Sequence, residues 1–241
     1  MSTGMDTPTG DPRIDAVLQR IAKVHEPYSR YKHPLWRGLM DGSFDRAQVR
    51  EFILQAGIIP LFNHLYHGPL YVKCPDPNWR EMIAEVVYEE GTGRMFADGV
   101  PHWKLWLRLG NAFGLSDEEM WNADFCPEAI AYRAFFHGIC SGDFLEGVSA
   151  HMLGSEAQVP GAVGSVSQGL KKKFNLSDED LAFYIVHDHA DGEHSDVGRQ
   201  LLSRFAKTDA DFDRVVGAVT QMVQVSQVLF NGILERVRNA K

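Results

Sequence analysis

The sequence predicts an all-α protein, built as a single-domain bundle of seven or more helices. Nearly every long segment of the 241 residues carries apolar residues at helical spacing, and no alternating strand pattern of any length occurs. No internal repeat or low-complexity linker divides the chain. We therefore expect a small, polar, disordered tail over residues 1–12 and one helical domain over residues 13–241.

Turn and cap residues delimit the helices predicted in the first half of the chain. Gly42 closes a short helix that begins at His33, and Ser43 caps a long helix over residues 44–71. Pro60 lies inside that long helix and is expected to kink it. Amphipathic segments predict two further helices, at residues 14–24 and 79–90.

Prolines and cap residues also delimit the second half. Pro101 precedes a helix over residues 102–114, Ser116 caps a short helical turn, and Pro127 opens a helix over residues 128–142. The remaining helices are predicted at residues 143–158, 161–174, 177–206 and 209–237.

Composition excludes several classes of function. The net charge is −8 without a long basic cluster, so we expect no nucleic-acid partner. No apolar run reaches the roughly 18 residues of a membrane span, and the first residues lack the pattern of a signal peptide. Three widely spaced cysteines without a CxxC pair argue against a disulfide framework and favour a reducing cytoplasm. A small-molecule substrate is the expected partner, and the long terminal amphipathic helices would suit a homodimer.

The stretch over residues 177–206 carries the most informative pattern. Its apolar stripe also holds His187, Asp191 and His194, at offsets i, i+4 and i+7, so the three side chains share one face. A carboxylate on a buried stripe is costly unless something compensates it. Imidazoles and a carboxylate that converge there suit iron, manganese or zinc. The alternative is a solvated polar face.

Three residues elsewhere could complete such a site. Glu89 ends one predicted helix and His102 begins the next, and the connection between them is rich in glycine. Glu156 shares a helix face with apolar residues, although a surface acid near a helix end is the simpler interpretation. Helix bundles often build di-iron centres from inward carboxylates and histidines. The full set has three carboxylates and three imidazoles: Glu89, His102, Glu156, His187, Asp191 and His194.

Three motifs carry a family resemblance: EEGTGRMFADGVPH, CSGDFLEGVSAHMLGSEAQVP and HDHADGEH. With them the chain resembles the haem-oxygenase-like di-iron oxidase and oxygenase family, in its CADD-like branch, over roughly residues 15–235. This family shares its fold with the TenA and PqqC proteins. The resemblance implies the same six metal ligands. The stretch before His102 is longer here than in the chlamydial members, so Glu90 could replace Glu89.

The resemblance also implies a reaction. Two Fe(II) ions would reduce dioxygen to a peroxo-di-ferric species, which oxidises or cleaves a small amino-acid-like substrate in a biosynthetic pathway, with no catalytic residues beyond the ligands. The aminobenzoate-forming members use a pocket Tyr and a Lys, where this chain has Trp36 and Val166. We therefore do not expect self-sacrificing aminobenzoate synthesis.

A substrate pocket is predicted beneath the kinked helix. Asn63 and His64 could line a cavity there, or could be ordinary polar groups of the core. The pocket residues are Trp36, Phe52, Gln55, Ile59 and Phe62.

Three other functions remain open. A metal-independent PqqC- or TenA-like oxidase or hydrolase is one, and the hydrolase would need Cys140 as its nucleophile. A metal-dependent phosphohydrolase could use His187 and Asp188. The third is a non-catalytic helical protein whose polar stripe binds a partner.

Overall fold

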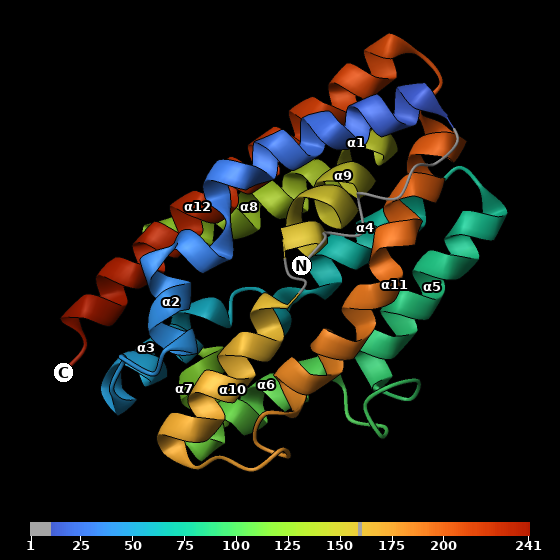
Figure 1. The fold of residues 1–241 in the computed structure, drawn as a ribbon. Coiled ribbons are helices and arrows are strands. Elements are labelled where there is room, and N and C mark those ends of the chain that lie inside the picture. Colours follow the sequence, from blue (N-terminus) through green and yellow to red (C-terminus); the bar gives the residue numbers. More distant parts are fainter. Residues whose placement is uncertain (1–10, 159–160) are drawn as a thin grey trace.

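The computed structural model describes the backbone of residues 11–158 and 161–241, and side chains of residues 11–157, 161–188 and 199–241. Within these ranges the regular structure comprises twelve α-helices with short 3-10 and π segments, and no strand (Figure 1). The prediction of an all-α bundle of seven or more helices is confirmed. No helix in these ranges is long and apolar enough to cross a lipid bilayer.

The longest helix, α12 (Asp209–Asn239), is the main packing partner of the other helices in the bundle. Thr208 and Asp211 form its capping box, and its buried face includes Val219, Met222 and Val223. It packs against α1 (Pro12–His25), α3 (Arg46–Ala56), α8 (Pro127–Ser141) and α9 (Phe144–Ser149). The hydrophobic core therefore lies along this helix, and α5 and α11 lie on the other side of the molecule (Figure 1).

The start of the chain differs slightly from the prediction. Residues 1–10 of the expected tail lie outside the described residues. Asp11 caps α1 through a hydrogen bond from the backbone N–H of Arg13, and Pro12 is its first residue. Helix α2 (Pro34–Met40) follows, and Gly42, with φ of 69°, makes the turn after it.

The prediction of one long kinked helix over residues 44–71 is wrong. The segment forms two helices, α3 and α4 (His64–Lys73), joined through a 3-10 turn at Pro60–Phe62. Pro60 lacks a backbone N–H and its ring clashes with the preceding turn, so the helix ends rather than bends. Asp45, not Ser43, is the N-cap of α3, with a capping box to Gln48.

The remaining helices lie close to their predicted places. Helix α11 begins at Ala182 because Ser177 caps a preceding turn through Asp180 instead of starting the helix itself. A π-helical segment at Ala150–Ser155 interrupts the helix expected over residues 143–158. The bounds are α5 (Pro77–Thr92), α6 (His102–Ala112), α7 (Asp117–Trp121), α10 (Ala162–Phe174) and α11 (Ala182–Phe205).

An ion pair connects the N-terminus of α5 to the C-terminal part of α11. The carboxylate of Asp76 caps α5 by accepting from the backbone N–H groups of Asn78 and Trp79. It also accepts from Nε of Arg204 at 2.7 Å, and a second guanidinium nitrogen pairs with the same oxygen. The guanidinium of Arg204 lowers the pKa of Asp76 below its ordinary value of 3.8. The pair thus joins the two helices that carry Glu90 and His187.

Asp76→Asn is expected to destabilise the protein in a pH-dependent way. A lowered folded-state pKa means that the carboxylate stabilises the fold above pH about 4, and that this contribution is lost as the pH falls through the folded value. The difference in unfolding free energy between wild type and variant should stay constant down to pH about 5 and shrink below pH about 4. Urea titrations at each pH measure it. Asp178→Asn, which breaks an exposed pair with Lys171, is the control, and equal pH profiles for both variants would contradict the assignment.

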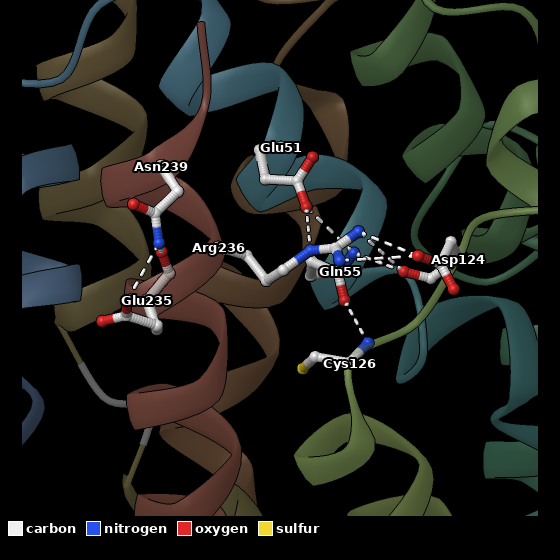
Figure 2. Close-up of polar contacts among 7 residues, drawn as sticks. All are labelled: Glu51, Gln55, Asp124, Cys126, Glu235, Arg236 and Asn239. Carbon is white, nitrogen blue, oxygen red and sulfur yellow. Dashed lines mark hydrogen bonds and ion pairs between the residues drawn. The ribbon is translucent and has the colours of Figure 1, made fainter.

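Gln55 is buried and belongs to a polar network that reaches the surface at Arg236 and Asp124 (Figure 2). Its Nε2 donates to the backbone oxygen of Asp124 at 2.9 Å and to Glu51 at 3.1 Å, and its Oε1 accepts from the backbone N–H of Cys126 at 2.8 Å. Arg236 of α12 donates to Glu51 at 2.8 Å and to the Asp124 backbone oxygen at 3.1 Å. Through these hydrogen bonds the network links the loop before α8 to α3 and α12.

Gln55→Leu is expected to lower the unfolding free energy by about 2–3 kcal/mol, because it leaves the buried backbone N–H of Cys126 without an acceptor and removes one of the two donors to the Asp124 carbonyl. Urea unfolding measures the change, and exposed Gln221→Leu should stay within about 0.5 kcal/mol of wild type. A Gln55→Leu protein as stable as wild type would show that the network carries no stability.

Candidate metal centre

The turn after α5 brings residues 89, 90 and 102 together. Gly93 ends the helix with φ of 63°, and its carbonyl accepts from the N–H groups of Ala97 and Gly99 at 3.0 and 2.8 Å. A Cβ at this glycine would lie 2.0 Å from the carbonyl oxygen of Val100. Only glycine fits here, and the tight turn returns the chain so that His102, at the start of α6, faces the last turn of α5.

Glu90, His102 and His187 form a compact cluster of metal-ligand atoms. Nδ1 of His102 lies 3.1 Å from Oε1 of Glu90, and Nε2 of His187 lies 4.0 Å from the same oxygen. The three donor atoms all lie within 4.8 Å of one another, and the imidazole centroids are 4.9 Å apart. A carboxylate and two imidazoles at this spacing are a ligand set for iron, manganese or zinc.

Each member of the cluster is oriented by a further contact. Asn63, after the 3-10 turn, donates its Nδ2 to Oε2 of Glu90 at 2.5 Å. Nδ1 of His187 lies 2.6 Å from the carbonyl oxygen of Phe183, so it donates its proton there and leaves the lone pair of Nε2 toward Glu90. Such outer contacts fix the tautomer and direction of metal-binding histidines.

Glu89 lies behind His102 rather than within the cluster. Its buried carboxylate accepts from the backbone N–H groups of Met95 and Phe96 at 2.7 and 3.1 Å. Oε1 also lies 3.1 Å from Nε2 of His102. His102 therefore lies between two carboxylates, with Nε2 toward Glu89 and Nδ1 toward Glu90.

Burial and charge set the protonation of the cluster. Burial by itself raises the pKa of Glu90, but the contact with His102 and the surrounding imidazoles outweigh it and lower the pKa. Burial lowers the pKa of His187, and the charge of Glu90 only partly offsets this. For His102, the adjacent carboxylates of Glu90 and Glu89 outweigh burial and raise the pKa. The cluster is a carboxylate beside imidazoles of unequal basicity.

The other predicted ligands lie near or beyond this cluster. Glu156 directly follows the π-helical segment, and its charge acts on His187, so it is within electrostatic reach of the cluster. Asp191 and His194 follow His187 by one and two turns of α11, and their side chains lie outside the described residues. The structure thus brings together Glu90, His102 and His187, with Glu89 and Glu156 beside them.

The predicted pocket residues fall into separate environments. The rings of Trp36 and Phe52 are both buried and meet edge to face, with centroids 6.0 Å apart. Phe62 instead contacts Trp121 and Phe125 at 6.2 and 6.1 Å. Ile59 packs partly buried against the core beside the helix break, and Gln55 belongs to the network described above.

Sequence reasoning left two residues of this site outside its ligand set. The sequence predicts Asn63 as a cavity residue or an ordinary polar group of the core. Its position three residues after Pro60 is the signal for its role, because the broken helix turns it toward α5. Glu90 was only an alternative to Glu89. A helical wheel cannot separate two adjacent residues when the helix ends directly after them.

The structure fits two of the alternative functions poorly: a hydrolase with Cys140 as nucleophile and a phosphohydrolase that uses His187 and Asp188. Burial raises the pKa of the fully buried Cys140 thiol, which suits a core residue better than a nucleophile. Asp188 is exposed, whereas its neighbour His187 belongs to the cluster, so the two do not share a site as a phosphohydrolase dipeptide would.

Comparison with known proteins gives the family. The family model described as "Iron-containing redox enzyme" matches residues 50–227, which include the whole cluster. A 4-aminobenzoate synthase of Nitrosomonas europaea is 25% identical over 96% of this chain and 93% of its own length.

Two solved structures share the fold. A CADD-like protein of unknown function from Nostoc punctiforme has a TM-score of 0.76 at 14% identity, with 95% of this chain and 99% of that one covered. A domain of unknown function from Shewanella denitrificans, with a haem-oxygenase-like fold, has a TM-score of 0.74 at 15% identity, with 92% of each chain covered. With the family model covering more than half of the chain, this protein is an oxidoreductase that belongs to the iron-containing redox enzyme family and has a haem-oxygenase-like fold.

Proposed function

We propose that the chain is a non-haem di-iron oxidase or oxygenase that binds two Fe(II) ions and uses dioxygen to oxidise or cleave a small amino-acid-like substrate in a biosynthetic pathway. The observation that carries this proposal is the cluster of Glu90, His102 and His187, formed across three helices. The ligands of the two ions are Glu90, His102, Glu156, His187, Asp191 and His194.

The chemistry of the donors fits a bound cation. Nδ1 of His102 is buried without a hydrogen-bond partner, although the Glu90 carboxylate is 3.1 Å away. A buried imidazole nitrogen next to a carboxylate oxygen is a donor pair that suits one shared metal ion. The complete set has a charge of about −3, which offsets most of the charge of two divalent ions.

The residues of the chain hold and orient this centre. Bound iron would supply the electrons for reduction of dioxygen. Asn63 holds one oxygen of Glu90 and leaves the other directed to the imidazoles. The carbonyl of Phe183 keeps Nε2 of His187 unprotonated, which is the form that binds metal.

We assign different roles to the two adjacent glutamates: Glu90 is the ligand and Glu89 orients His102. The Glu89 carboxylate accepts hydrogen bonds from two backbone N–H groups, which hold it in place. Nε2 of His102 also donates to this carboxylate. That contact leaves the lone pair of Nδ1 free for the metal. This carboxylate–histidine–metal arrangement recurs at metal sites of proteins.

Glu89→Gln is expected to weaken ferrous iron binding about 10- to 100-fold while the number of sites at saturation stays unchanged. Anaerobic titration with Fe(II) measures both values. Glu85→Gln, an exposed acid on the same helix, should bind iron as wild type does. If Glu89→Gln lost a whole iron site while Glu90→Gln kept both, Glu89 would be the ligand and Glu90 the orienting residue.

The curated relatives support a biosynthetic reaction but not a particular substrate. The Nitrosomonas europaea protein is named as a 4-aminobenzoate synthase, and at 25% identity its substrate is not transferred to this chain. Trp36 and Val166, which stand where aminobenzoate-forming members have a Tyr and a Lys, are both buried in this structure. We propose a reaction of the same general kind on a different substrate.

The test of the function is oxygen uptake by the iron-loaded enzyme. The anaerobic protein is loaded with Fe(II), its metal content is counted, and it is exposed to oxygen with and without a panel of amino acids and fatty acids. Oxygen uptake that a panel member accelerates, and that His102→Ala loses, would support the proposal. Absence of both iron and oxygen uptake would overturn it in favour of a non-catalytic binding protein.

A further inference from the structure

We propose that Arg30, Trp36 and Tyr184 form a binding site for the carboxylate group of the substrate. This inference rests on the proposed function, because it names the class of molecule that the iron centre acts on, a small organic acid. Its basis is a pair of buried donors without partners, beside a guanidinium group.

The two unsatisfied donors are the indole Nε1 of Trp36 and the hydroxyl of Tyr184. The residues are 9% and 4% exposed, and neither polar atom has a hydrogen-bond partner within the described part of the chain. By contrast, the buried indole of Trp106 is satisfied, because its Nε1 donates to the carbonyl of Ile53 at 3.2 Å. Buried polar groups are nearly always paired, so an acceptor from outside the chain is expected here.

Arg30 supplies the charge beside these donors. Its guanidinium carbon lies 4.7 Å from the ring centroid of Trp36 and 5.5 Å from that of Phe230, which holds the group by cation–π contacts. Burial raises the pKa of Tyr184, and the charge of Arg30 acts in the opposite direction, so the guanidinium is also within electrostatic reach of that hydroxyl. Arg30 therefore places a positive charge near both unsatisfied donors.

This group of residues adjoins the metal centre. Tyr184 precedes His187 by three residues on α11, so the two side chains lie about one turn apart on the same side of the helix. The ring of Trp106 contacts Tyr184 at 6.3 Å and Phe183 at 4.8 Å, and Phe183 packs against His187 at 4.3 Å. A ligand held at Arg30 would therefore extend toward the cluster.

The chemistry of the three groups selects a carboxylate. A guanidinium offers N–H donors in a planar fork, and indole N–H and phenol O–H add single donors, so the site suits an acceptor-only anion with two oxygens. Phe52 and Phe230 line the indole with apolar surface, which fits an organic remainder better than a small inorganic anion.

Titration calorimetry of the full-length, iron-loaded chain under anaerobic conditions tests the site without turnover. The probes are L-phenylalanine, benzoate and hexanoate, each with its neutral amide, and inorganic phosphate. We expect at least one acid to bind about tenfold or more tightly than its amide, since the amide lacks the charge and one acceptor. Arg30→Gln should remove that preference, and Tyr184→Phe and Trp36→Phe should each weaken binding of the acid several-fold.

Arg133→Gln is the matched control, because its guanidinium lies 4.6 Å from the ring centroid of Phe62 at a different place; it should leave binding of the acid unchanged. Arg30→Lys retains the charge and serves where the Gln variant does not fold. Equal affinity for every acid and its amide, no binding of any acid, an unchanged preference in Arg30→Gln, or tighter binding of phosphate than of every acid would each overturn the proposal. Iron counts on the same samples separate this result from a failure of the di-iron function.

Discussion

Glu90→Ala is expected to lower the iron content of the anaerobically loaded protein from about two ions per chain to one or fewer. Oε1 of Glu90 lies 3.1 Å from Nδ1 of His102 and 4.0 Å from Nε2 of His187, so among the side chains that the structure describes it is the carboxylate that adjoins both imidazoles. Its removal leaves two imidazoles that have lost their common anionic partner. Metal analysis after gel filtration measures the content.

The matched control is Glu85→Ala, on the same helix and exposed, which should retain the wild-type iron content. Circular dichroism confirms that both variants fold. A Glu90→Ala protein that still holds two ions would contradict the assignment of this residue as a ligand.

Gly93→Ala is expected to destabilise the fold by about 3 kcal/mol or more and to reduce iron binding together with stability. The new Cβ would lie 2.0 Å from the carbonyl oxygen of Val100, and the backbone φ of 63° is itself unfavourable for alanine. Relief of the clash must open the turn, which carries His102 away from Glu90. Urea unfolding and iron titration on the same preparation measure the two effects.

Gly91→Ala gives the contrast. Gly91 lies within α5, and a Cβ there meets nothing within 4 Å. The substitution should leave stability unchanged or raise it by about 0.5–1 kcal/mol, with normal iron binding. If both alanine variants behave alike, the turn at Gly93 does not position the centre.

Local signals in the sequence were sufficient for most of the fold. Helices ended where proline, glycine and cap residues predicted, because such residues act through their own backbone geometry. Pro127 opens α8, and the final helix begins at Asp209 as expected. Three positions are exceptions. Asp45 replaces Ser43 as the cap of α3, and Ser177 caps a turn that precedes α11. At Pro60 a kink and a complete break have the same local signature, and packing of the two halves decides between them.

The candidate site was less accessible to sequence reasoning. The i, i+4, i+7 pattern predicts His187 on an inward face through helical periodicity, and in the structure this side chain lies beside Glu90 and His102. Glu89 and Glu90 differ only through the geometry of the following turn, which contacts Glu89 at Met95 and Phe96. The role of Gln55 depended on a loop 69 residues later in the chain, which no local pattern indicates.

The most direct test of the account is the number of ferrous ions bound per chain by wild type and by His187→Ala under anaerobic conditions. We expect about two ions in wild type and one or fewer in the variant, with the helical content of both unchanged. Equal iron content in the two proteins, or none above background in wild type, would contradict a di-iron centre built on Glu90, His102 and His187.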